Sequence, residues 1–223
     1  MNPVETNSAR GPGAALIVCA QASVALLAGH PGGGASPLLA DVLRSEAAQR
    51  LPDAIVHGGF VLVLAIELIG FAALAVRLGA ARTAVLAAMV FFLIGAGLLA
   101  ASMIVDGLLT PAVAARYVAA PFAKQEAARA LLVLIGEAIR VLMPMGLAFQ
   151  GAAALAWGAA LIARPTGRIN GGVAVAAGAA TLLAAAASLW IPSPHLLMLA
   201  LLAQAAWTLT AGVTLFRTAS PSA

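Results

Sequence analysis

Glu67 stands in the middle of an apolar run, residues 55–76, that holds no other Asp, Glu, Lys or Arg. The run is long enough to cross a bilayer as a helix, which places Glu67 roughly 18 Å below Ile55. A charge near the bilayer centre costs at least about 2.5 kcal/mol, so acids at that depth face other helices rather than lipid. No cation occurs at the same depth in the other runs, and we therefore expect a protonated, hydrogen-bonded carboxyl group.

Three glutamines are candidate partners of Glu67, because each lies at a comparable depth in another apolar run: Gln21, Gln150 and Gln204. An amide group can both donate a hydrogen bond to a carboxyl group and accept one from it. We interpret these four residues as a candidate site for a proton or a small ligand. A purely structural contact between helices is the alternative that the sequence leaves open.

A second set of ionisable residues lies where the apolar runs meet water on one side of the membrane. All three histidines of the chain belong to this level, and His30 directly follows the first run. If the groups converge, they form an outer polar vestibule about 10 Å across. Alternatively, these residues occupy unrelated positions in the membrane interface. Glu137 and Arg140 are three residues apart, so a structural ion pair would account for both of them. The predicted vestibule consists of His57, Asp106, Glu137, Arg140 and His195.

Histidine and carboxylate groups are zinc ligands, and the methionines in the same outer third could suit copper. However, no His-x-x-x-His or His-x-x-Glu-His spacing is present, and methionine more often fills gaps in apolar packing. The sequence therefore assigns no metal site, and any cofactor is unknown. No Gly-x-Ser-x-Gly or Walker sequence occurs either, so no catalytic residue is assigned and enzymatic activity is left undecided.

The composition determines the elements that must position these residues. The chain is 63% hydrophobic and 9% charged, and its mean hydropathy is +1.04, whereas soluble domains carry about 25% charged residues. Six apolar runs approach the about 20 residues that a membrane-spanning helix needs, and none alternates as a barrel strand would. The expected fold class is an all-α, polytopic transmembrane bundle of six helices: residues 14–29, 55–76, 84–105, 141–163, 171–191 and 196–216.

The chain divides into a tail of residues 1–13, one membrane domain of residues 14–217 and a tail of residues 218–223. After the first run, apolar residues recur at helical spacing from Leu39 to Leu51, opposite charged residues, which predicts an amphipathic helix in the membrane interface. The first run also imitates a cleaved signal peptide at Ala20-Gln21-Ala22. Because apolar residues continue to Ala28, a retained helix is favoured.

Arginine positions predict the orientation. The short links at residues 77–82 and 164–168 hold four arginines and no acid, and positive residues beside helix ends favour the cytoplasmic side. With six spans, both termini are then cytoplasmic, and we expect a multi-pass protein of the inner (plasma) membrane. Its main partner is the lipid bilayer. No basic stripe interleaved with aromatic residues occurs, so no nucleic-acid partner is expected.

Three functions are compatible with this pattern. The favoured interpretation is transport: a small bundle that handles a proton, an ion or a small amphipathic ligand through the outer vestibule and Glu67. The second is a membrane-embedded enzyme that acts at the outer leaflet through the His/Asp/Glu cluster. The third is an accessory or assembly subunit of a membrane complex, with an oligomer or another protein as partner.

Overall fold

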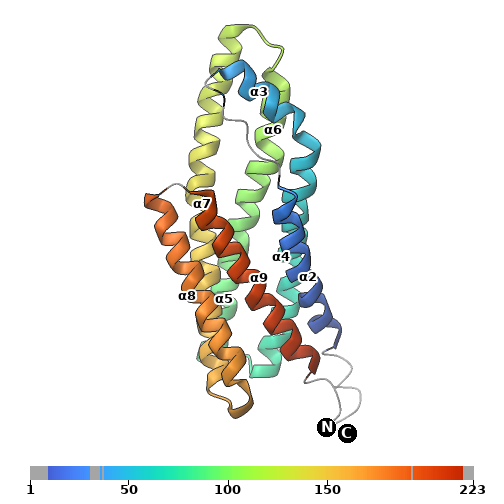
Figure 1. Cartoon of the computed structure of the whole chain (residues 1–223), viewed down its shortest axis with the longest axis vertical. Helices are drawn as coiled ribbons and strands as arrows, with labels where there is room; N and C mark the ends of the chain where they lie inside the picture. Colours follow the sequence, from blue (N-terminus) through green and yellow to red (C-terminus); the bar gives the residue numbers. More distant parts are fainter. Residues whose placement is uncertain (1–9, 31–35, 37, 192, 218–223) are drawn as a thin grey trace.

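The computed structural model describes residues 10–30, 36, 38–191 and 193–217, and these residues form helices and turns without any strand. The long helices run along one axis (Figure 1). The first described residues of α2 and the last of α9 lie together at one end, where a Cβ on Gly13 would lie 2.7 Å from the backbone nitrogen of Phe216. An even number of spans therefore returns the chain to the end from which it started.

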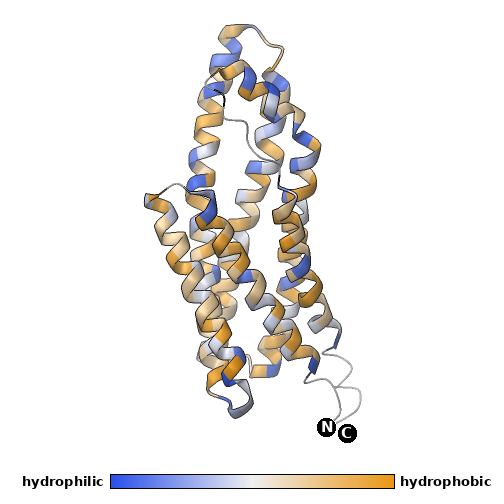
Figure 2. Ribbon diagram, viewed as in Figure 1, coloured by the Kyte–Doolittle hydropathy of each residue, from blue (hydrophilic) through white to orange (hydrophobic). Residues whose placement is uncertain are grey.

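Six helical segments are long and apolar enough to span a membrane, which confirms the predicted all-α bundle. Hydrophobic residues dominate the middle of the molecule, whereas hydrophilic residues are more frequent toward its two ends (Figure 2). The first helix begins at Arg10 rather than near residue 14, and residues 1–9 and 218–223 lie outside the described residues. The segments are α2 (Arg10–Ala28), α4 (Arg50–Leu78), α5 (Thr83–Ile104) with η1 (Val105–Leu109) and α6 (Thr110–Tyr117), α7 (Phe122–Ile162), α8 (Arg168–Trp190, after the short turn η2, Pro165–Gly167) and α9 (Pro194–Arg217).

The helices differ in length. The 41 residues of α7 extend over about 62 Å and the 23 residues of α8 over about 35 Å. As a result, α4, α6 and α7 project beyond α8 and α9 at the end opposite the termini (Figure 1). We term this end the histidine end, and the opposite end, which carries Arg77 and Arg164, the arginine end.

The predicted amphipathic helix is α3 (Leu39–Ala48), which lies across the histidine end (Figure 1). Its apolar side packs on protein, mainly α6, so that Leu43 is fully buried. Its polar side carries an exposed ion pair between Asp41 and Arg44, 3.0 Å apart. The helix thus connects α2 to the projecting part of the bundle.

Pairs of glycines set the closest helix contacts. A Cβ on Gly178 of α8 would lie 2.7 Å from the carbonyl oxygen of Gly151 on α7, and a Cβ on Gly151 would lie 2.8 Å from the carbonyl oxygen of Gly178. Only glycine allows backbones to approach so closely, a common arrangement in membrane bundles. Similar pairs join α7 to α8 again, α2 to α9, and α5 to α7: Gly158 with Gly171, Gly13 with Gly212, and Gly95 with Gly146.

A layer of aromatic side chains fills the bundle on the arginine side of Glu67. The ring of Phe71 stacks with those of Trp157 and Trp207, at centroid distances of 6.1 and 5.9 Å. Beyond this layer, the guanidinium of Arg164 donates a hydrogen bond of 3.0 Å to the carbonyl of Leu78 at the end of α4. The described residues of the arginine end are therefore closely packed, and the two cavities described below lie on the other side of this layer.

Candidate functional site

Two of the cavities between the aromatic layer and the histidine end adjoin each other. The larger, of about 410 Å³, has His57 and Asp106 in its wall, and we term it the histidine cavity. The smaller, of about 50 Å³, has Glu67 in its wall, and we term it the glutamate cavity. Both take walls from α2 or the residues after it, α4, the α5–η1 segment, α7 and α9. Three side chains line both cavities: Phe60, Met103 and Leu201.

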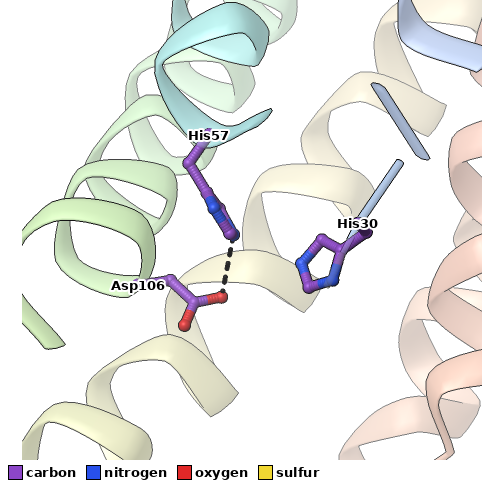
Figure 3. Close-up of side chains that lie close together, drawn as sticks. All are labelled: His30, His57 and Asp106. Atoms are coloured by element: carbon purple, nitrogen blue, oxygen red, sulfur yellow. Dashed lines mark ion pairs between the residues drawn. The ribbon is translucent and has the colours of Figure 1, made fainter. Parts of the chain in front are cut away.

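His57 is the most buried ionisable residue of the histidine cavity, with 2% of its surface exposed. Its Nδ1 lies 3.0 Å from the backbone carbonyl oxygen of Asp53, which can only accept a hydrogen bond, so Nδ1 carries a proton. Its Nε2 lies 3.2 Å from Oδ2 of Asp106. The His30 ring approaches from the end of α2, with its centroid 5.0 Å from that of His57 (Figure 3). One potential ligand atom from each of these three residues lies within 4.8 Å of the others.

Local backbone structure explains how Asp106 reaches His57. Asp106 belongs to η1, a five-residue π-helical segment inserted between α5 and α6. Such wider turns are rare and occur frequently at functional sites. The neighbouring residue Gly107 is buried, and a Cβ there would overlap the His57 ring. A glycine within the wider turn therefore lets η1 and α4 approach until the carboxylate and the imidazole meet.

The histidine cluster, which consists of His30, His57 and Asp106, lies in acidic surroundings. Asp53, one helical turn before His57, is buried, and its carboxylate lies 3.9 Å from Nδ1 of His57. Burial raises the pKa of Glu46 on α3, and the negative charges of Asp53 and Asp106 raise it further. Among the described residues, no arginine or lysine lines the histidine cavity. This concentration of carboxyl groups favours cations over anions at the cluster.

Glu67 is 8% exposed, and its carboxyl group accepts a hydrogen bond from Thr208 of α9. Gln150 and Gln204 line the same cavity, but their amides donate to other groups. Gln150 Nε2 lies 3.3 Å from the Phe92 carbonyl oxygen and Gln204 Nε2 lies 2.9 Å from Thr181 Oγ1. The structure thus brings three of the four predicted residues to one cavity, with Thr208 as the partner of Glu67.

Gln21 differs from the other glutamines, because its side chain is exposed on the outside of α2 and does not line the glutamate cavity. The depth of Gln21 in the membrane could be predicted from its position in the apolar run, but the side of α2 from which its side chain projects could not. A residue one or two positions away on the same helix points to a different side, and Ser23 lines the cavity instead.

The predicted vestibule contains His57 and Asp106, but its other three members do not line the histidine cavity. Glu137 and Arg140 are exposed and pair with each other, with Arg140 Nη2 2.7 Å from Glu137 Oε2. His195 is also exposed. Their neighbours Ile139 and Pro194 line the cavity in their place. The histidine cavity is therefore more apolar than the predicted vestibule, and the ionisable residues that line it are His30, His57 and Asp106.

Three contributing residues were absent from the predicted site: His30, Asp53 and Thr208. Two could have been found from spacing, since Asp53 lies four residues before His57 and Thr208 four residues after Gln204, so that each pair shares a helix face. His30 was placed at the correct level but was not included, because the turn after α2 gives no periodicity from which to infer its direction.

These features define an integral membrane protein of the all-α, multi-pass class, with a histidine cluster around the buried His57 at one end and a buried acid near its centre. Searches of the protein-family models, of the curated proteins and of the solved structures find no match for this chain. The two cavities and the groups in their walls are therefore the features from which a function can be inferred.

Proposed function

We propose that this protein transports a small cation, which enters the bundle at the histidine end and passes from the histidine cavity to the glutamate cavity. The observation that carries the proposal is the wall that the two cavities share, formed by Phe60, Met103 and Leu201. These side chains separate an acidic cluster at the membrane boundary from a buried acid near the centre. In membrane proteins, ionisable groups arranged in this way mark ion and proton pathways.

The size of each cavity supports this direction of entry. The histidine cavity, at about 410 Å³, is large enough for a hydrated cation. The glutamate cavity, at about 50 Å³, has room for only a few waters, since one water needs roughly 10–15 Å³. An ion that moves inward would therefore exchange most of its water for the carboxyl of Glu67 and the polar atoms of Gln150 and Gln204. The aromatic layer closes the far side, so release there requires a change of conformation.

The proposal includes an orientation. We place the histidine end on the periplasmic side of the inner membrane and both termini in the cytoplasm. The support is the arginine end, where Arg77 and Arg82 follow α4 and Arg164 and Arg168 lie between α7 and α8. Short links rich in arginine favour the cytoplasmic side.

The first experiment tests the shared wall with a matched pair of substitutions on α9. Leu201→Trp places a large side chain between the cavities, whereas Leu202→Trp places the same side chain on an exposed position of the same helix. Purified variants are reconstituted in liposomes, and uptake of protons and of Zn²⁺ is followed with entrapped dyes. We expect Leu201→Trp to reduce uptake of the transported ion at least about tenfold and Leu202→Trp to leave it near the wild-type rate.

The second experiment uses Glu67→Gln, with Glu137→Gln as its control, because Glu137 is exposed and lies outside both cavities. We expect uptake to be lost in Glu67→Gln and retained in Glu137→Gln. Wild-type liposomes that take up neither ion faster than empty liposomes, or equal rates in all variants, would refute the transport proposal.

Enzymatic activity is the second candidate, and one observation favours it. The carboxylate of Asp106 lies 3.2 Å from Nε2 of a buried imidazole at the wall of a mainly apolar cavity. Such a pair can remove a proton from a water or an alcohol during hydrolysis of a lipid-like substrate. Mass spectrometry of bilayer lipids after incubation with the protein distinguishes this candidate, since a transporter leaves the lipids unchanged.

A further inference from the structure

We propose that His30, His57 and Asp106 bind one divalent transition-metal ion of the zinc type in the wall of the histidine cavity. This inference deepens the proposed function, because it names the cation that would enter there. It differs from the expectation from sequence, which assigned no metal. Binding can be measured without a membrane, however, so the metal site and the transport activity can fail separately.

The ligand set fits zinc. Two imidazole nitrogens and one carboxylate oxygen are the protein ligands of an open zinc site, in which the fourth position is left to water or substrate. Magnesium and calcium prefer oxygen ligands alone, so the two imidazoles argue against them. The fourth position here would face the histidine cavity, which is lined by all three residues.

The distances also fit. Two atoms bound to one tetrahedral zinc, each at about 2.0–2.1 Å, lie roughly 3.3–3.5 Å apart. The Nε2 atom of His57 and the Oδ2 atom of Asp106 are already 3.2 Å apart. The potential ligand atoms of all three residues lie within 4.8 Å of one another. The His30 ring lies beside the other two side chains (Figure 3), and because His30 is exposed, we expect a rotation of its side chain to close the remaining distance.

The orientation of His57 provides an independent argument. Its Nδ1 proton is donated to the backbone carbonyl of Asp53, so the neutral ring presents the lone pair of Nε2 to the cavity wall. Histidines that bind metals usually donate their other nitrogen to a carbonyl or a carboxylate in this way. Nε2 is buried and has no aligned hydrogen-bond partner in the described part of the chain, despite its short distance to Asp106. A metal ion between the two atoms would satisfy both.

An ion pair without metal and a copper site both fit the cluster less well than zinc. A direct ion pair between a protonated His57 and Asp106 accounts for their distance, but it does not explain why a ligand atom of His30 also lies within 4.8 Å of both. Copper(I) prefers sulfur ligands, and methionine side chains do line the cavity, among them Met103 and Met198. The atoms that converge, however, are nitrogen and oxygen.

The experiment measures zinc binding by the full chain, purified in detergent, freed of metal and titrated in competition with a chromophoric zinc chelator. We expect one zinc per chain in the wild type. His57→Gln and Asp106→Asn should each weaken binding at least about tenfold, because even the loss of a group behind a ligand costs that much. His195→Gln is the control, since His195 is an exposed histidine at the same end that does not line the cavity.

X-ray absorption of the zinc-loaded protein gives a second measurement. We expect two imidazoles around zinc in the wild type and one in His30→Gln. Less than one zinc per chain, equal affinity in all variants, or a sulfur ligand in the spectrum would overturn the proposal. Zinc binding without uptake of either ion into liposomes would refute the transport proposal and support the metal site. Proton uptake without zinc binding would refute the metal site and support the transport proposal.

Discussion

The contact between α7 and α8 allows a sharp test of the packing. We predict that Gly178→Ala destabilises the protein. The new Cβ would lie 2.7 Å from the Gly151 carbonyl oxygen and 2.9 Å from the Leu155 nitrogen, whereas ordinary contacts begin near 3.4 Å. Both neighbours are backbone atoms, so the helices must separate by more than half an ångström. Overpacking of this kind costs about 1–3 kcal/mol. Because both clashes are with backbone atoms, we take the upper part of this range, about 2–3 kcal/mol. Alanine favours the helix by about 1 kcal/mol, which leaves a net loss of about 1–2 kcal/mol.

The chain contains its own reporter for this measurement. Cys19 is the single cysteine, and its side chain is 2% exposed, so a thiol-reactive fluorophore labels it only when the bundle opens. A loss of 1 kcal/mol lowers the melting temperature of a chain of this size by about 2–4 °C. We therefore expect Gly178→Ala to melt roughly 2–8 °C below the wild type in the same detergent.

Gly172→Ala is the matched control, because it makes the same change on α8 where no atom lies within 4 Å of the new Cβ. Its melting temperature should equal that of the wild type or exceed it slightly, since alanine is the better helix former. The reasoning is refuted if Gly178→Ala melts with the wild type, or if Gly172→Ala falls by the same amount.

Three further predictions concern the site, the topology and the histidine end. Gly107→Ala should displace His57 and weaken zinc binding at least about tenfold, measured in the same chelator competition, while Gly97→Ala on α5, which has open space, should not. Cysteines that replace the exposed residues Ala81 and Thr166 should react with an impermeant reagent from the cytoplasmic side only, as labelling of intact cells and of inverted vesicles will show. A carboxyl whose pKa is raised by folding lowers stability above its ordinary value of 4.5, so Glu46→Gln should raise the melting temperature at pH 7, with the gain shrinking as the pH falls toward 4.

The number and approximate limits of the spans could be predicted from the sequence because hydropathy is a local property. Each helix must satisfy its own backbone hydrogen bonds in lipid, and about 20 apolar residues suffice for this. The α3 helix was also predicted, since its polar and apolar residues alternate at helical spacing over ten residues. The packing partner of that helix could not be inferred, because α6 lies more than sixty residues away along the chain.

The direction of each side chain was predicted less well than its depth. Lipid and the bundle interior are both apolar, so a spanning helix does not need a polar side and an apolar side. Glu67 is an exception, because an acid must avoid lipid. For Gln21, Glu137 and His195 the sequence contained no such constraint, and all three are exposed. The π-helical turn at Asp106 also interrupts the regular helical spacing between α5 and α6, and nothing in the pattern around Asp106 indicated it.

The glycine pairs also determine which parts of the bundle can slide. Backbone contacts leave no side chain that can give way, so we expect α2 and α9 to move as one unit and α5, α7 and α8 as another. By contrast, α4 meets α2 through leucine side chains opposite Gly59 and Gly70, and such side chains can rotate. Both cavities lie along the boundary between the two units, with α4 beside it. We therefore expect any opening and closing of the pathway to proceed as a shear along this boundary, in which Glu67 on α4 moves relative to Thr208 on α9.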